Sequence, residues 1–267
     1  MSDKGEDAAS DRTFARRLNF RDYGGYRALD DARLVSGLLY RSAEPERAGA
    51  DGLRQFRKIG FSAIVDFRNR HEAPAVASAP IAARRVAGDI ENGVVPHAIE
   101  RFRGLADAEA ARAAMRQVYL DLVTGPHFLD TVGRYLTALA TTDGPTLVHC
   151  VAGKDRTGLA VALFQSLLGV RHEDIAREFL LTNAGGQPRK DYLLSALAQE
   201  DALQGMLPEV MEELLGVRAE FLETAFAHIA GNADHPADYL VRHAGIEPRL
   251  PDMLREKFLL RAGGQAV

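Results

Sequence analysis

The ten residues from His149 to Gly158 constrain the fold of this chain more than any other segment. They read His-Cys-Val-Ala-Gly-Lys-Asp-Arg-Thr-Gly and contain the only cysteine among the 267 residues. An apolar run with strand character precedes them from Pro145, and leucines at helical spacing follow up to Val170. The segment therefore predicts a strand, a tight loop and a helix, with the cysteine at the end of the strand.

The residues of this loop suit an oxyanion held beside a nucleophile. Gly153 allows the backbone to turn tightly, so that the loop N–H groups can point inward. The helix expected to begin near Thr157 directs its positive end at the same hollow. This field and Arg156 are expected to favour the thiolate form of Cys150, which is a competent nucleophile. Arg156 also offers a planar pair of donors for two phosphate oxygens, which a lysine does not.

The motif His-Cys-x5-Arg-Thr-Gly resembles the signature of the cysteine-dependent protein tyrosine phosphatases, and Cys-x-x-Gly-Lys-Asp-Arg-Thr resembles their atypical bacterial branch. Residues 19–26 are similar to the Asn-Phe-Arg-Asp-x-Gly-Gly segment that opens these domains, and residues 39–42 and 64–68, followed by Glu72, also match the family pattern. The resemblance covers residues 14–260. It implies hydrolysis of phosphotyrosine, and in some members also of phosphoserine, phosphothreonine or phosphoinositides.

The resemblance also implies a mechanism of two steps. The Cys150 thiolate attacks phosphorus to form a phosphocysteine intermediate while a general acid protonates the leaving oxygen, and water then hydrolyses the intermediate. Arg156 and the backbone amides of residues 151–156 stabilise the equatorial oxygens, and the Thr157 hydroxyl assists departure of the sulfur. The residues expected around the substrate are His149, which orders the loop, and Val151, Ala152, Gly153, Lys154, Asp66 and Arg68.

The identity of the general acid is less constrained. Many tyrosine phosphatases take this acid from a Trp-Pro-Asp loop, but this chain contains no tryptophan. In the atypical branch the acidic residue beside the loop arginine has this role, which points to Asp155. Asp66, after a predicted strand, is a second candidate, although an ion pair with a nearby arginine is the favoured interpretation. Asp121 is a third, at the usual separation from the cysteine but inside a predicted helix.

The substrate also stays open at this stage. Lys154 resembles the lysine in the loop of phosphoinositide phosphatases of the tensin-homologue type, but those loops carry a second lysine directly after the cysteine, where Val151 stands here. Protein phosphotyrosine, with dual specificity, is the leading hypothesis and a phosphoinositide the alternative. A phosphate-binding module without turnover and a rhodanese-like sulfurtransferase are alternatives of other classes, which the intact Cys150, Arg156 and Thr157 disfavour.

The motifs of the resemblance are dispersed through the chain and must converge in one fold, so we expect a single phosphatase domain at residues 13–262, preceded by a disordered tail at 1–12. The hydrophobic content of 46% suffices for a full core. A net charge of −4 and a pI near 6.1 disfavour nucleic acid as a partner. One cysteine excludes an intrachain disulfide, and the eight histidines show no zinc spacing, so we expect neither metal nor cofactor.

No apolar run is long enough to cross a bilayer and no signal peptide is apparent, which favours a cytoplasmic protein, with export by another route left open. Nothing in the sequence indicates the oligomeric state.

The remaining patterns predict an α/β fold with a central, largely parallel sheet flanked by helices and a C-terminal helical region. Residues 187–229 are rich in leucine and methionine and follow a pair of glycines, so they form either an ordinary packed subdomain or a lid over the site. The expected strands are 33–41, 61–67, 81–86 and 145–151. The expected helices are 48–58, 106–123, 127–140, 157–168, 172–182, 189–198, 208–226, 236–244 and 248–260.

Overall fold

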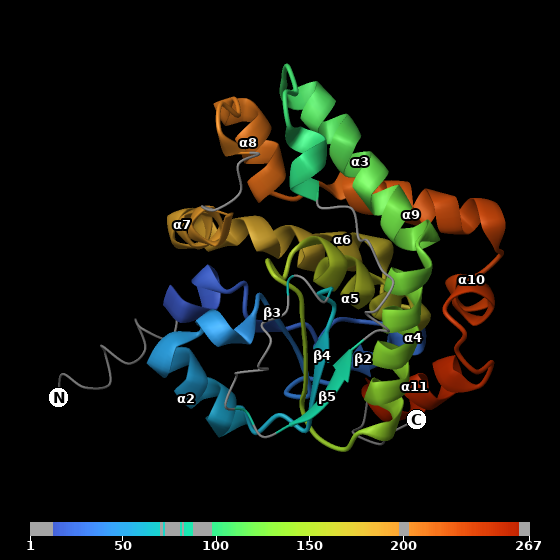
Figure 1. The fold of residues 1–267 in the computed structure, drawn as a ribbon. Coiled ribbons are helices and arrows are strands. Elements are labelled where there is room, and N and C mark those ends of the chain that lie inside the picture. The colour runs from blue at the N-terminus through green and yellow to red at the C-terminus, as the bar shows by residue number, and fades with distance from the viewer. Residues whose placement is uncertain are drawn as a thin grey trace.

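A five-stranded sheet forms the centre of the computed structural model, which describes residues 13–69, 72, 81, 83–87, 98–197 and 203–261 (Figure 1). Its strand order is β1-β3-β6-β4-β5, and only β1 runs antiparallel to its neighbour. The strands are β1 (Arg21–Asp22), β3 (Leu39–Ser42), β6 (Thr146–His149), β4 (Ala63–Asp66) and β5 (Arg84–Ala87). The predicted α/β fold with a largely parallel sheet is confirmed.

The strand register brings the functional loop to one edge of this sheet. Residue His149 of β6 pairs with Ser42 of β3 on one side and with Asp66 of β4 on the other. Because these three strands are parallel, their carboxyl ends lie together, which is where open α/β sheets bind ligands. Cys150 follows His149 directly at this edge.

Alternating apolar side chains let helices cover both faces of the sheet. On one face Ile64 and Leu147 lie in a cluster with Phe56 of α2 (Gly49–Ile59). On the other face Val65 and Val148 join a larger core with residues of α4 (Pro126–Thr141) and α5 (Asp155–Leu167). Figure 1 shows α2 and α4 on opposite sides of the strands.

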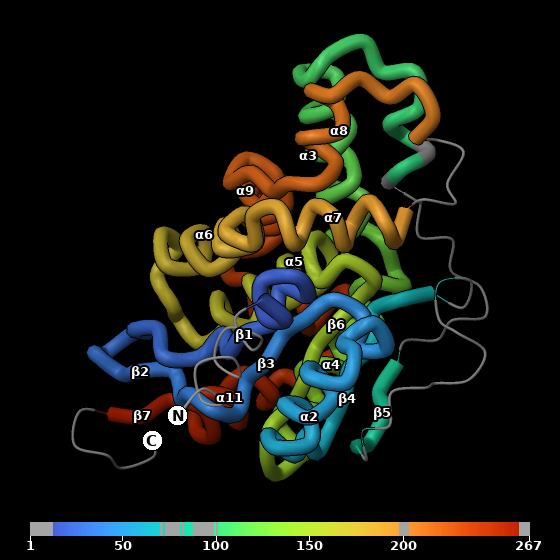
Figure 2. Tube along the Cα trace, turned by 90° about the vertical axis from the view of Figure 1, so that its left-hand side faces the viewer, coloured from blue at the N-terminus to red at the C-terminus, as the bar shows by residue number. Residues whose placement is uncertain are grey.

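Several of the helices beyond α5 form a layer over the loop edge of the sheet, whereas the last two pack against α4. Figures 1 and 2 both show α7 passing above the strands, with α8 and α3 further out. The helix α3 (Ala108–Thr124) packs against α8 and α9. The others are α6 (His172–Leu180), η4 (Leu181–Gly185), α7 (Gly186–Leu197), α8 (Pro208–Leu215), α9 (Ala219–Asn232), α10 (Pro236–His243) and α11 (Leu250–Phe258). Three further short 3-10 helices in the described residues are η1 (Leu29–Asp31), η2 (Pro45–Arg47) and η3 (Ala98–Phe102).

Two predicted elements are each divided in the structure. The predicted strand 33–41 is two strands, β2 (Arg33–Leu34) and β3, because Gly37 adopts a φ of +84° and turns the chain between them. The predicted helix 208–226 is α8 and α9, because the backbone at Gly216 is extended (φ −93°, ψ −175°) and ends α8.

Smaller differences concern element ends. The predicted helix 248–260 ends at Phe258, because Leu259–Leu260 forms β7 and pairs antiparallel with β2. The helix after the cysteine loop begins at Asp155, two residues before its predicted start. The predicted strand 81–86 is β5 at residues 84–87. The predicted tail at 1–12 lies outside the described residues.

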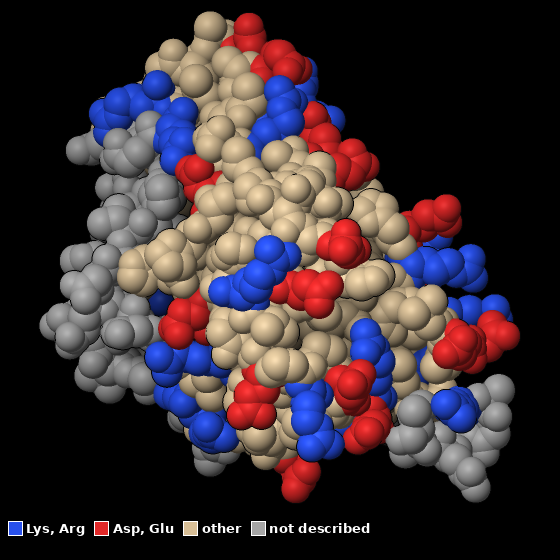
Figure 3. Space-filling view, turned by 90° about the vertical axis from the view of Figure 1, so that its right-hand side faces the viewer, with Lys and Arg blue, Asp and Glu red and all other residues tan. Residues whose placement is uncertain are grey.

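The surface seen in Figure 3 carries lysine and arginine side chains interspersed with aspartate and glutamate. No broad field of positive charge covers this face, in keeping with the net charge of −4. None of the helices in the described part of the chain combines the length and apolar character that a membrane span requires.

Candidate active site

The loop after β6 curls around the sulfur of its cysteine. The Cys150 side chain is buried, and its Sγ accepts a hydrogen bond from the Gly153 N–H at 3.2 Å. Gly153 has a φ of +60°, and a Cβ atom there would lie 2.2 Å from the Ser42 carbonyl oxygen. Only glycine therefore fits this position, and the requirement comes from the neighbouring strand β3 as well as from the turn.

The carbonyl groups of the loop are held outward by donors from five residues elsewhere in the chain. The pairs are Val151 O with the Glu44 amide (3.0 Å) and the Tyr192 hydroxyl (3.2 Å), Ala152 O with Arg189 Nη2 (2.8 Å), and Gly153 O with Asn19 Nδ2 (2.7 Å) and Arg41 Nη2 (3.0 Å). With its acceptors fixed on the outside, the loop is shaped as a cradle of donors. The first turn of α5 adds N–H groups that have no acceptor within the helix.

Arg156 is held in place by a carboxylate at its far side. Its Nη1 and Nη2 atoms lie 2.6 and 2.7 Å from the two carboxylate oxygens of Glu72, and Nη1 also donates to the Phe67 carbonyl at 3.0 Å. Burial by itself would lower the pKa of the guanidinium, but Glu72 raises it above the ordinary value. Arg156 is therefore a fixed cation that lines the same cavity as Cys150.

A buried arginine and a partly buried one supply positive charge beneath the loop. Arg21 and Arg41 share one carboxylate, Glu178, with contacts of 2.7 Å each. Burial raises the pKa of Glu178, but the two guanidinium groups outweigh it and lower the pKa overall. Two cations against one anion leave a positive field under the cysteine loop, which suits a bound anion.

We expect Glu178→Gln to lower the free energy of unfolding by about 3–5 kcal/mol, because it leaves the buried Arg41 and the partly buried Arg21 without their carboxylate. The control is Glu173→Gln, an exposed position on the same helix, with an effect within about 0.5 kcal/mol. Urea denaturation measures both. A loss for Glu178→Gln as small as that of the control would contradict this role of the carboxylate.

The same carboxylate predicts sensitivity to acid. Because its pKa is lower in the folded protein than its ordinary value of 4.5, the unfolded chain binds more protons as the pH falls. The stabilisation is complete above pH 4.5 and is lost as the pH falls through the folded pKa. Urea denaturation at a series of pH values should show a steeper loss below pH 4.5 for the wild type than for Glu178→Gln, and equal slopes would contradict the assignment.

A cavity of about 130 Å³ opens over Cys150. Two carboxylates are found among its described lining residues, Glu72 and Asp155, and Glu72 is engaged by Arg156. Asp155 Oδ1 accepts a hydrogen bond from the Tyr119 hydroxyl at 2.9 Å. The rest of the wall is largely apolar and includes Ile99, Val118, Leu122, Leu193, Leu197 and Leu214.

Lys154 reaches away from the loop toward the helical layer. Its Nζ atom donates to the carbonyl oxygens of Leu214 (2.7 Å) and Gly216 (3.0 Å), and lies 3.3 Å from Asp155 Oδ1. The residue is only 3% exposed. Lys154 thus fastens the end of α8 to the cysteine loop.

Asp66 forms the ion pair that the sequence favoured for it. Its carboxylate accepts from the Arg68 amide, Nε and Nη2 at 2.7–3.1 Å, and Arg68 also contacts Glu46 and Glu44. Burial raises the pKa of Asp66, but His149 and Arg68 outweigh it and lower the pKa. Neither Asp66 nor Arg68 is among the described residues that line the cavity over Cys150.

His149 and Thr157 are fully buried beside this cavity. His149 Nδ1 lies 3.3 Å from the Cys150 carbonyl oxygen, and Nε2 lies 3.6 Å from Asp66 Oδ2. Burial lowers the pKa of His149, which favours the neutral ring. The Thr157 hydroxyl has no hydrogen-bond partner among the described residues. Asp121 lies on α3, bonded to Arg101 and Gln117, and is not among the described residues of the cavity wall.

Several residues of the site were not among those singled out from the sequence. Asn19, Arg41 and Glu72 occurred within segments that matched the family pattern, but nothing in the sequence assigned them contacts with the loop. Tyr119, Arg189 and Tyr192 come from helices far from the loop in sequence and carried no local signal. Among the described residues, no group of three potential metal ligands occurs.

A cysteine at a strand end, a loop whose carbonyls are held outward and a fixed arginine form an arrangement that suits a phosphate group. The chain belongs to the tyrosine phosphatase family, whose model matches residues 13–260. The resemblance read from the sequence is thereby confirmed, and membership makes the chain a phosphoric monoester hydrolase.

Two relatives match most of the chain. A protein from Cupriavidus necator named as a tyrosine-protein phosphatase is 33% identical over 238 residues, which cover 86% of this chain and 82% of that protein. The triple specificity protein phosphatase PtpB of Mycobacterium tuberculosis is 28% identical over 277 residues, which cover 89% of this chain and 95% of PtpB.

Proposed function

We propose that this phosphatase hydrolyses phosphotyrosine in proteins, with activity on phosphoserine and phosphothreonine, through a phosphocysteine intermediate at Cys150. The observation that carries the proposal is the position of the Cys150 sulfur. It accepts a hydrogen bond from the Gly153 N–H, inside a loop whose carbonyl groups are held outward. The apolar wall of the cavity suits an aromatic ring above the phosphate.

In the first step the Cys150 sulfur forms a bond to phosphorus and the bond to the leaving tyrosine oxygen breaks. The loop amides and Arg156 stabilise the three equatorial oxygens. In the second step water attacks phosphorus, the sulfur–phosphorus bond breaks and inorganic phosphate leaves. The Thr157 hydroxyl has no hydrogen-bond partner among the described residues, and we assign it the role of donating a hydrogen bond to the departing sulfur.

We assign the general acid to Asp155. Of the two carboxylates among the described residues of the cavity wall, Glu72 holds both terminal nitrogens of Arg156. Asp66 is enclosed by Arg68, and Asp121 is bonded on α3. Asp155 lines the cavity with Cys150 and is oriented by Tyr119, so it can deliver a proton to the leaving oxygen and accept one from the attacking water.

We expect Asp155→Asn to slow hydrolysis of substrates with poor leaving groups far more than that of p-nitrophenyl phosphate, whose leaving oxygen needs little protonation. General acid catalysis contributes about 10²–10⁴-fold, so the loss on a phosphotyrosine peptide should fall in that range. Steady-state kinetics with both substrates measure the difference. Asp66→Asn serves as the comparison, and equal losses on both substrates for Asp155→Asn would remove it from this role.

The segment from α7 to α8 is proposed to act as a lid. Leu193 and Leu197 of α7 and Leu214 of α8 line the cavity over Cys150, so these helices cover it. Tyr192 and Lys154 fasten the same helices to the loop through hydrogen bonds to carbonyl groups. We infer that this cover moves when a protein substrate reaches Cys150.

A phosphoinositide is the second candidate substrate. In its support, one relative is named a triple specificity phosphatase and the loop carries a lysine. Against it, the Lys154 ammonium group is bound to the carbonyls of Leu214 and Gly216 and is not directed at a phosphate in the cradle. Protein phosphotyrosine therefore stays the leading proposal.

The test is phosphate release from a matched panel of a phosphotyrosine peptide, phosphoserine and phosphothreonine peptides, and mono- and polyphosphorylated phosphoinositides. Cys150→Ser run beside the wild type identifies the release that depends on the loop. Highest activity on the phosphotyrosine peptide supports the proposal. A preference for phosphoinositides would replace it with the second candidate, and no release dependent on Cys150 would point to a binding module.

A further inference from the structure

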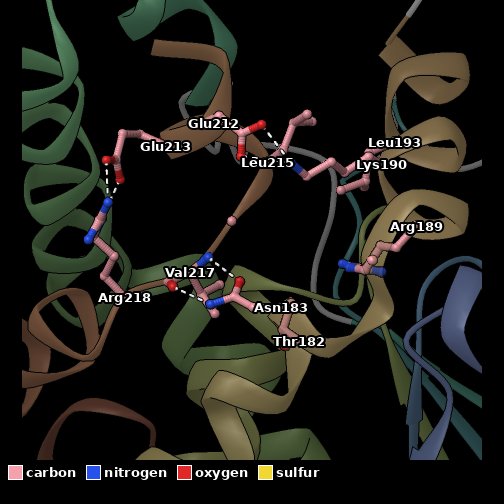
Figure 4. Close-up of a pocket in the computed structure, with 12 residues that line it drawn as sticks. Thr182, Asn183, Arg189, Lys190, Leu193, Glu212, Glu213, Leu215, Val217 and Arg218 are labelled. Carbon is pink, nitrogen blue, oxygen red and sulfur yellow. Dashed lines mark hydrogen bonds and ion pairs between the residues drawn. The ribbon is translucent and has the colours of Figure 1, made fainter. Parts of the chain in front are cut away.

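A second cavity lies behind the cysteine loop, between η4, α7 and the connection from α8 to α9 (Figure 4). Its volume is about 370 Å³, within the range of small-molecule sites. It does not include Cys150 or Arg156 among its described lining residues, although Leu193 and Leu215 line both cavities. The two cavities are therefore neighbours separated by apolar side chains.

The charged residues around this cavity are paired, with one exception. Lys190 lies 2.5 Å from Glu212 and Arg218 lies 2.5 Å from Glu213, as Figure 4 shows. Arg189 lines the same cavity and forms no ion pair with a carboxylate of the described residues. The cavity therefore has a surplus of positive charge at Arg189.

Arg189 is deeply buried yet incompletely bonded. Its side chain donates from Nη2 to the Ala152 carbonyl at 2.8 Å, while Nε and Nη1 have no acceptor in the described structure. The residue is only 3% exposed. Burial and the charges of Arg21 and Arg41 lower its pKa to about 10, so it stays a cation at neutral pH. A buried cation without a counter-charge is costly, and a bound anion would remove that cost.

We propose that this second cavity binds a phosphate group, with Arg189 as its central ligand. Arg189 is the lining cation without a carboxylate partner among the described residues, and its Nε and Nη1 atoms carry three N–H groups that suit the oxygens of a tetrahedral anion. Both atoms are buried from solvent, so the proposal includes a turn of the guanidinium group toward the cavity when the anion binds. The enzyme itself releases phosphate from its substrates in the neighbouring cavity. Because Arg189 also holds the Ala152 carbonyl, the site contacts the cysteine loop from behind.

The proposal is separable from the proposed function, because the binding test needs no turnover. Isothermal titration with inorganic phosphate is carried out on Cys150→Ser, which keeps every arginine. We expect two phosphates per chain for Cys150→Ser and one for Cys150→Ser with Arg189→Gln. The matched control is Cys150→Ser with Arg177→Gln, an exposed arginine outside both cavities, which should keep two.

A second variant keeps the test decisive if Arg189→Gln does not fold. Arg156→Ala removes the main ligand of the first cavity, so a folded Arg156→Ala protein should still bind one phosphate. Adding Arg189→Gln should weaken that remaining binding at least about tenfold, equivalent to about 1.4 kcal/mol. One phosphate for Cys150→Ser, or none for folded Arg156→Ala, would overturn the proposal.

Two further titrations distinguish the source of the phosphate group. If Arg156→Ala binds glycerol 3-phosphate as well as inorganic phosphate, the cavity is a site for phosphorylated molecules. If it binds inorganic phosphate alone, the cavity is a site for the free product of the reaction. Acetate is the specificity control. Acetate binding as tight as phosphate binding would contradict a site selective for phosphate.

Discussion

Cys150→Ser should reduce phosphatase activity by a factor on the order of 10⁴ or more, as expected when a nucleophile is removed. Serine preserves the size and burial of the side chain, but its hydroxyl is not ionised at neutral pH, and no base among the described residues is bonded to this position to activate it. The Gly153 N–H donates to the sulfur, but the other contacts of the cradle and those of Arg156 do not involve it. Steady-state assays with p-nitrophenyl phosphate measure the loss.

The same variant should still bind a phosphotyrosine peptide, because the donors that recognise the phosphate are unchanged. Fluorescence anisotropy with a labelled peptide provides this control and shows that the loop is folded. Activity retained within tenfold of the wild type would contradict covalent catalysis by Cys150.

Arg156→Lys should lower kcat by at least about 10²–10³-fold, the loss typical of one preorganised donor to a developing oxyanion. The arginine uses both terminal nitrogens to hold Glu72 at 2.6 and 2.7 Å, which fixes the plane of the guanidinium group. A lysine has one ammonium group, so it cannot keep that bidentate pair and also present a planar pair of donors to phosphate.

Glu72→Gln is the matched comparison for this arginine. Glutamine keeps the shape and one acceptor oxygen, so Arg156 stays charged and near its place, and the fall in kcat should be smaller than for Arg156→Lys. A kcat for Arg156→Lys within tenfold of the wild type would show that the planar fork is not needed. If kcat fell further for Glu72→Gln than for Arg156→Lys, the Glu72 carboxylate would contribute more to catalysis than the Arg156 guanidinium group.

The sequence was sufficient to predict the centre of this site, because its residues are contiguous. The strand, the loop with Gly153 and the helix after it follow from local pattern, and the structure places Cys150, Asp155 and Arg156 on one cavity. The parallel sheet followed from the order of strands and helices. The division at Gly216 was missed because both α8 and α9 have helical spacing, and only the extended backbone there separates them.

The contacts that shape the loop could not be predicted in the same way. The residues that contact the loop from elsewhere in the chain are Glu72, Arg189 and Tyr192. Within its own segment, each of them looks like an ordinary surface or core residue. The position of the Lys154 ammonium group was also hidden, because it depends on two carbonyls at the end of α8. Sequence spacing placed this lysine in the loop but did not show that its side chain points toward the end of α8.

The most direct test of the account is a search for the phosphocysteine intermediate. The wild-type protein is mixed rapidly with a ³²P-labelled phosphotyrosine peptide, quenched under denaturing conditions during turnover and digested, and the labelled peptide is identified by mass spectrometry. The account predicts covalent label on the peptide that contains Cys150, absent from Cys150→Ser. Turnover in the same mixture without label on that peptide would contradict it.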